Sequence, residues 1–181
     1  WLTVPIKKKG NSFKKISEVE INYEAKKTRS ILKSIELSYK KSSYFNEVFS
    51  MLNDIFEKKY RFIYELNQDL IKTISNKLGF ELVYLESNKF LSGDQKNLKG
   101  NDLVLEIAKT TYCTSYLSGK GCLDFIKPES FKNQGILFKF HDFNHPSYIQ
   151  FSSNSFISNL SIIDALFNIG FNNTRKILLS S

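Results

Sequence analysis

The strongest hydrophobic pattern lies near the C-terminus, in the stretch FISNLSIIDALFNIG at residues 156–170. Seven of the ten residues from Leu160 to Ile169 are apolar, which predicts a helix buried on nearly all sides. Ser161, Asp164 and Asn168 are polar exceptions that follow at i, i+3 and i+7. This spacing places the three side chains on one stripe of the helix. A buried carboxylate must be hydrogen-bonded, so the stripe needs partners.

Two interpretations of this stripe are open. Ser161 and Asp164 match the S-x-x-D capping box that begins a helix before an apolar run. The alternative is a polar site that includes the cap and binds a ligand. In either case Gly170 is predicted to end the helix.

Helical periodicity also appears earlier in the chain. It predicts one helix over about 24–39, a second over 48–56 and a third over about 60–78, each with apolar residues at helical spacing. The third is expected to stop at Gly79. A further helix is predicted around Leu103 to Ala108.

Strand-like segments surround these helices. They are Trp1–Ile6, Ile16–Ile21, Phe80–Leu85, Tyr112–Leu117 and the alternating stretch Gly135–His141. Strands that alternate with helices favour parallel β–α–β units. The predicted fold class is therefore α/β, with a mostly parallel sheet flanked by helices and a helical insertion at 24–78. An α+β fold, in which the two N-terminal strands pair separately, is the alternative. The tail after Gly170 is expected to form a final strand or to fray.

The four residues Ser118, Gly119, Lys120 and Gly121 follow a predicted strand. Ligands of parallel sheets bind beyond the carboxyl ends of the strands. Backbone amides of the glycines could approach an anion there, and Lys120 could neutralise it. An ordinary tight turn is the alternative interpretation, since the spacing of a full phosphate-binding loop is missing.

A second polar segment runs from His145 to Gln150. Pro146 prevents regular strand pairing, so this segment is predicted to be a loop or an edge. His145, Tyr148 and Gln150 supply donors and acceptors that recognise small polar ligands. A surface loop histidine is the alternative for His145.

Composition and charge narrow the functional classes. The 181 residues carry a net charge of +8, yet only three of the 26 basic residues are arginine, which argues against a nucleic-acid partner. No apolar run is long enough to span a membrane. Cys113 and Cys122 form neither a disulfide framework nor a zinc set, so we expect a cytoplasmic protein without a structural metal. Because the chain begins without Met, we expect a fragment whose N-terminal part is missing.

Several short motifs follow one another in a fixed order along the chain. They are WLTVPI, Tyr39, Tyr44-Phe45, Leu66-Asn67, Leu78-Gly79, YLSGKG at 116–121, Phe131, Gly135-Ile136, Pro146, Tyr148, Gln150 and FISNLSIIDALFNIG. Together they resemble the WbqC-like protein family of bacterial surface-polysaccharide gene clusters. The resemblance covers Trp1 to Gly170, as a single domain that lacks the N-terminal segment usual in the family. The loop at Lys120 departs from the small residues usual there.

This resemblance implies an aminoacyl (glycine) or acyl transferase acting on an activated sugar during O-antigen or capsule assembly. The partner would be a small-molecule sugar or sugar nucleotide, while no cofactor is indicated. His145 and Asp164 are then the candidate bases. The candidate substrate-binding residues are Ser118, Gly119, Lys120, Gly121, Tyr148, Gln150, Asn159, Ser161 and Asn168.

Two other functions are compatible with the sequence. One is a nucleotide-dependent ligase or nucleotidyltransferase, with its phosphate loop in the missing N-terminal segment. The other is a non-catalytic protein of the same pathway that binds a sugar nucleotide.

Overall fold

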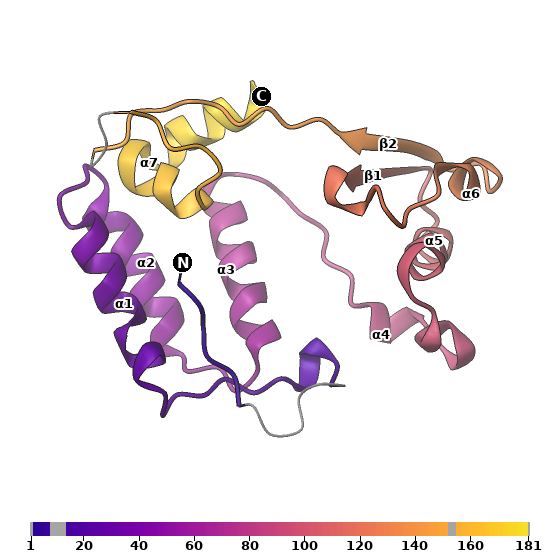
Figure 1. Cartoon of the computed structure of the whole chain (residues 1–181), viewed down its shortest axis with the longest axis horizontal. Helices are drawn as coiled ribbons and strands as arrows, with labels where there is room; N and C mark the ends of the chain where they lie inside the picture. Colours follow the sequence, from indigo (N-terminus) through magenta and orange to yellow (C-terminus); the bar gives the residue numbers. More distant parts are fainter. Residues whose placement is uncertain (1, 8–13, 152–154, 181) are drawn as a thin grey trace. The chain divides into compact units, whose positions relative to one another are not determined.

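The computed structural model describes residues 2–7, 14–151 and 155–180. The chain divides into two compact units (Figure 1). Unit 1 comprises residues 1–82 and 145–181, and unit 2 comprises residues 83–144. In the sequence, unit 2 is therefore one continuous stretch that follows the first segment of unit 1 and precedes the second.

Unit 1 is built from four longer helices around one core (Figure 1). These are α1 (Lys26–Tyr39), α2 (Phe45–Glu57), α3 (Ile63–Lys77) and α7 (Ile162–Leu179). A short 3-10 helix, η1 (Ile16–Glu18), precedes them. The three helices predicted between residues 24 and 78 are thus confirmed.

The core of unit 1 follows the helical spacing of the sequence. The apolar stripe of α2 is buried as predicted, and Leu166 and Phe167 of α7 are fully buried against it. Other buried members of the same core are Ile21, Ile31, Ile35, Leu66, Leu78 and Phe171. Burial of this apolar surface is the main stabilising term for the unit.

Gly170 interrupts α7 as the sequence predicted, but the chain does not leave the helix there for good. Its backbone angles of φ 73° and ψ 174° are non-helical, and a second helical stretch continues from it to Leu179. This conformation is essentially restricted to glycine. The tail is therefore helical, and the expectation of a final strand or a frayed end is wrong.

Unit 2 contains a small β–α–β arrangement with two further α-helices and two short 3-10 helices. The elements are α4 (Ser87–Phe90), η2 (Gly93–Asn97), α5 (Gly100–Thr110), β1 (Ser115–Gly119), η3 (Lys120–Cys122), α6 (Pro128–Lys132) and β2 (Leu137–His141). The strands β1 and β2 pair in parallel, from Ser115 opposite Leu137 to Gly119 opposite His141. The fold class of helices with a parallel sheet is confirmed, although this sheet has two strands.

The alternation predicted for residues 135–141 is also present. Phe138 and Phe140 are half-buried, while Leu137, Lys139 and His141 are exposed. Phe131 of α6 is fully buried and its ring centroid lies 5.1 Å from that of Phe138. Helix α6 therefore covers one face of the strand pair.

Three predicted strands do not form as regular strands in the described residues. Residues 80–86 have no regular secondary structure, and the side chain of Val83 is 90% exposed. Residues 16–18 form the 3-10 helix η1, and only single antiparallel bridges connect Ile6 with Ile21 and Glu20 with Phe62. The prediction of a strand over 1–6 is likewise wrong for residues 2–6, which contain only the bridge at Ile6, and Trp1 lies outside the described residues.

Candidate functional site

The polar stripe of α7 begins at its cap. The Ser161 hydroxyl accepts a hydrogen bond from the Ile163 N–H at 3.4 Å, as expected of an N-cap residue. Asp164 lies in the first turn and is only 6% exposed. In a capping box its carboxylate would accept from the Ser161 N–H, but its hydrogen bonds go to other parts of unit 1.

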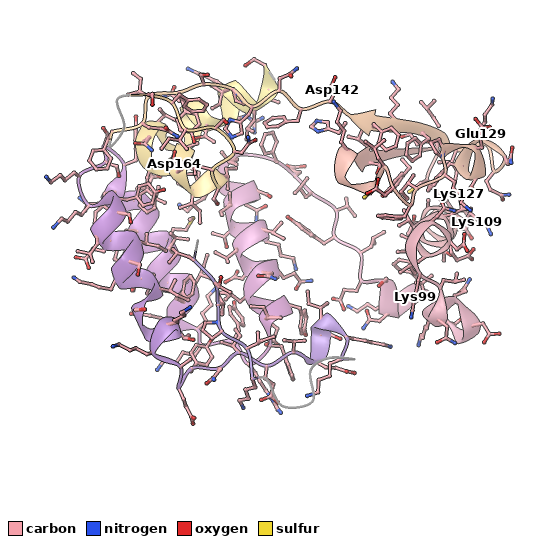
Figure 2. The ribbon with its side chains drawn as sticks, in the orientation of Figure 1. Lys99, Lys109, Lys127, Glu129, Asp142 and Asp164 are labelled. Atoms are coloured by element: carbon pink, nitrogen blue, oxygen red, sulfur yellow. The ribbon has the colours of Figure 1, made fainter. Side chains whose placement is uncertain are left out.

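The Asp164 carboxylate accepts hydrogen bonds from three side chains. The Tyr39 hydroxyl donates to Oδ1 at 2.9 Å, the Tyr148 hydroxyl donates to Oδ2 at 2.8 Å, and Gln150 Nε2 donates to Oδ2 at 3.0 Å. Figure 2 shows Asp164 on α7. One carboxylate thereby joins α7 to the end of α1 and to the segment at 148–150. We call Asp164, Tyr39, Tyr148 and Gln150 the Asp164 cluster.

Gln150 also holds the loop that precedes α7. Its Nε2 donates to the Ile157 carbonyl at 2.9 Å and its Oε1 accepts from the Ile157 N–H at 2.8 Å. This pair of bonds imitates the pairing of two backbones. Gln150 is 8% exposed, so its amide is committed to this structural role.

Asn168 extends the stripe by one more turn. Its Nδ2 donates to the Asp164 carbonyl at 2.8 Å, and its Oδ1 accepts from the Phe151 N–H at 2.8 Å. The amide thus ties the same loop to α7. The stripe that the sequence predicted is real, and within the described residues its partners come from the protein itself.

Burial and these bonds change the acidity of the two phenols. Burial, followed by the hydrogen bond to Asp164, raises the pKa of Tyr148 to about 12 and raises the pKa of Tyr39 well above its ordinary value. A phenol that donates to a carboxylate is stabilised in its neutral form. Both tyrosines therefore stay protonated at neutral pH.

His145 lies beside this cluster. Its ring centroid is 6.4 Å from that of Tyr148 and 5.8 Å from that of Phe156. His145 Nδ1 lies 3.2 Å from the Pro146 carbonyl oxygen. A carbonyl can only accept, so Nδ1 is the donor if this contact is a hydrogen bond. The imidazole is half-buried.

The segment Ser118–Gly121 belongs to unit 2 and lies where the two parallel strands end. Ser118 is 1% exposed and Gly119 pairs with His141. Lys120 forms a salt bridge with Asp142, which is labelled in Figure 2. This salt bridge lowers the pKa of the Asp142 carboxyl. The Lys120 ammonium is therefore already paired with the Asp142 carboxylate.

Asn159 was predicted as a site residue and Tyr39 was not, but the structure places Tyr39 in the Asp164 cluster and Asn159 outside it. Asn159 is exposed, adopts φ 59° and donates to the Ser158 hydroxyl at 3.2 Å, outside the Asp164 cluster. Tyr39 was named only among the family motifs, at the end of the helix predicted over about 24–39. Its ring does stack on Phe167, with centroids 4.4 Å apart, but its hydroxyl reaches Asp164. The hydroxyl of a buried tyrosine usually has a hydrogen-bond partner. The sequence signal for this contact was therefore a tyrosine at the end of an apolar stripe.

Two kinds of feature are absent from the described ranges, 2–7, 14–151 and 155–180. These ranges contain no group of three or more His, Cys, Asp or Glu side chains placed to hold a metal ion. Within the same ranges, no helix has both the length and the apolar character needed to cross a membrane.

Comparison with known proteins assigns the chain to a family. It belongs to the WbqC-like protein family, whose sequence model matches residues 1–176. The chain is also 26% identical over 172 residues to "Uncharacterized protein Rv1507c" of Mycobacterium tuberculosis, a match that covers 94% of this chain and 72% of that protein. No solved structure matches this chain.

Proposed function

We propose that this protein transfers an acyl group, such as glycyl, from an activated donor to a sugar or sugar nucleotide used in surface-polysaccharide assembly. Membership of the WbqC-like family supports the proposal. The observation that carries it is the position of His145. Its imidazole packs on Tyr148, and the Tyr148 hydroxyl is fixed by the buried Asp164 carboxylate.

The reaction balances with a single base. The amine or hydroxyl of the sugar attacks the carbonyl carbon of the acyl donor, and His145 Nε2 takes the proton that the attacking atom loses. The tetrahedral intermediate then collapses, which breaks the bond between the acyl carbon and the leaving group. The imidazolium returns the proton to that leaving group, so the base is regenerated.

We assign Asp164 to positioning and His145 to proton transfer. A carboxylate that is 6% exposed and accepts three hydrogen bonds is poorly placed to take a proton from a substrate. Gln150 and Asn168 likewise hold the loop before α7. Tyr148 keeps acceptor capacity on its hydroxyl oxygen and is the member of the cluster we propose to contact substrate. The Ser118–Gly121 segment stays a separate prediction.

The test is a transfer assay with candidate donors and acceptors. The chain is incubated with acyl-coenzyme A or glycyl-tRNA and with amino-sugar nucleotides, and mass spectrometry follows the sugar product for the gain of one acyl group. A general base contributes about 10²–10⁴-fold, so His145→Ala should lose on that order of turnover. His141→Ala is the matched control, because His141 is the other histidine and is exposed in unit 2.

Two results would contradict this assignment. Full turnover by His145→Ala would remove His145 from the mechanism. Binding of sugar nucleotides with no product from any donor would favour the non-catalytic function instead.

A further inference from the structure

A cavity of about 400 Å³ lies in unit 1, away from the Asp164 cluster. It is formed where the first half of α1 meets the end of α2. The Asp164 cluster lies near the opposite end of these helices, where the Tyr44 N–H before α2 donates to the Phe167 carbonyl. Helix α2 has a length of roughly 18 Å at 1.5 Å per residue, so the two places are separate.

The cavity has the size and wall of a small-molecule site. Pockets that bind small ligands are mostly a few hundred Å³ in volume and combine apolar walls with a few polar groups. Tyr23, Leu32 and Phe56 supply the apolar wall, and each is half-buried. This volume suits one sugar ring with a substituent.

Two acceptors on one turn of α2 line the same cavity. Asn53 Nδ2 donates to Glu57 Oε1 at 2.9 Å, which fixes the two side chains against each other. Asn53 Oδ1 and Glu57 Oε2 accept no hydrogen bond from the described residues. A pair of fixed acceptors is suited to neighbouring hydroxyl groups of a ligand.

Lys59 brings a positive charge to the cavity from an unusual backbone position. It follows the C-cap of α2 with φ 49°, a left-handed conformation that glycine normally occupies at this point of a helix. Among the residues that the structure describes, its ammonium has no carboxylate partner. This conformation costs a lysine more than a glycine, and the side chain that it carries lines the cavity.

We propose that this cavity binds a small polyhydroxylated anion, such as a monosaccharide phosphate or a sugar acid. The hydroxyls donate to Asn53 Oδ1 and Glu57 Oε2, the ring lies on Phe56 and Tyr23, and the anionic group pairs with Lys59. Each contact uses a group that lines the cavity, and hydrogen bonds with a charged partner are the stronger ones. The proposal is independent of acyl transfer at His145.

The experiment is calorimetric titration of the full chain with glucose 1-phosphate, glucuronate, neutral glucose and inorganic phosphate. We expect the two sugar anions to bind more tightly than glucose or phosphate alone. Because the chain carries a net charge of +8, phosphate that binds as well as glucose 1-phosphate would overturn the proposal. Absence of binding by both sugar anions would overturn it as well.

Lys59→Gly is an informative variant, because it removes the positive charge without disturbing the backbone conformation. Glycine fits the left-handed position, so the melting temperature should stay the same or rise, while Kd for glucose 1-phosphate should rise about tenfold or more. Lys40→Gly is the control, since Lys40 is exposed at the end of α1 and carries the same charge. Equal weakening by both variants would show unspecific attraction and overturn the site. Glu57→Gln should also weaken binding of glucose 1-phosphate, through the lost acceptor.

Discussion

Gly170 lies directly against the ring of Tyr44: a Cβ atom at position 170 would be 2.6 Å from Tyr44 Cε1. This contact occurs at the kink of α7, where the backbone of Gly170 has φ 73° and ψ 174°. The backbone angles disfavour any residue but glycine, and the Tyr44 ring would have to move to admit a side chain. Gly170 therefore permits the interruption of α7 and the close packing of the residue before α2.

The first prediction concerns Gly170→Ala. The variant should lower the free energy of unfolding by about 2–3 kcal/mol, mainly because alanine is strained in this conformation. The Tyr44 ring is partly exposed and can turn aside, so removing it should restore little. Urea unfolding measures the loss. Gly119→Ala, at φ −72° with no atom within 4 Å of its Cβ, should cost less than about 0.5 kcal/mol, and a similar loss there would contradict the explanation.

A second prediction concerns the carboxylate of the Asp164 cluster. Asp164→Ala removes the acceptor of two hydroxyls and one amide in a buried place, so we expect a loss of about 2–4 kcal/mol in unfolding free energy. Asp142→Asn is the matched control, because Asp142 is exposed and its salt bridge with Lys120 lies on the surface. Circular dichroism during denaturation compares the two. Equal stability of Asp164→Ala and the unchanged chain would mean that the cluster does not hold unit 1 together.

The third prediction is a loss of stability at high pH. The pKa of Tyr148 is raised from 10.0 to about 12 in the folded chain. The unfolded chain therefore releases this proton first, so the stabilisation is complete below pH 10 and is lost as the pH rises through about 12. Tyr39 acts in the same direction. Melting temperatures measured across this range should fall less steeply for Tyr148→Phe, and an identical slope would contradict the assignment.

The fourth prediction concerns Arg175. Its guanidinium donates to the Leu78 carbonyl at the end of α3 and lies 4.8 Å above the centroid of the Phe80 ring. Arg175→Ala should cost about 1–2 kcal/mol, because the carbonyl loses a charged donor and the ring loses its cation. Lys176→Ala, exposed on the same helix, should be close to neutral. Thermal unfolding of both variants decides between a specific cap and a general charge effect.

The helices of unit 1 could be predicted because their apolar spacing records which face is buried. The five-residue strand β2 could be predicted for the same reason, since Phe138 and Phe140 alternate with Lys139 and His141. The segment 80–85 has the same strand character, but a strand also requires a partner for its backbone hydrogen bonds. Its own residues cannot specify that partner, and in the structure the side chains of residues 81–85 are exposed instead.

The candidate site was predictable to the extent that it depends on one helix. Asp164 and Asn168 share a stripe that the sequence displays, and Tyr148 and Gln150 were expected as ligand-binding residues of a polar loop. Tyr39 is separated from Asp164 by 125 positions, so local periodicity assigns it to a core face without its hydroxyl partner. The Ser118–Gly121 segment falls in unit 2, and spacing along a chain does not reveal such a division.

The division of the chain also sets an order for its folding during synthesis. Every core residue of unit 2 comes from one continuous stretch, whereas α7 supplies Leu166 and Phe167 to the core of unit 1 from beyond that stretch. Chains are made from the N-terminus and domains fold as units, so unit 2 can close first. A ribosome that stalls before Ile162 would carry α1, α2 and α3 with the apolar surface that α7 normally covers still open. That nascent chain, more than the finished protein, is the species expected to need a chaperone.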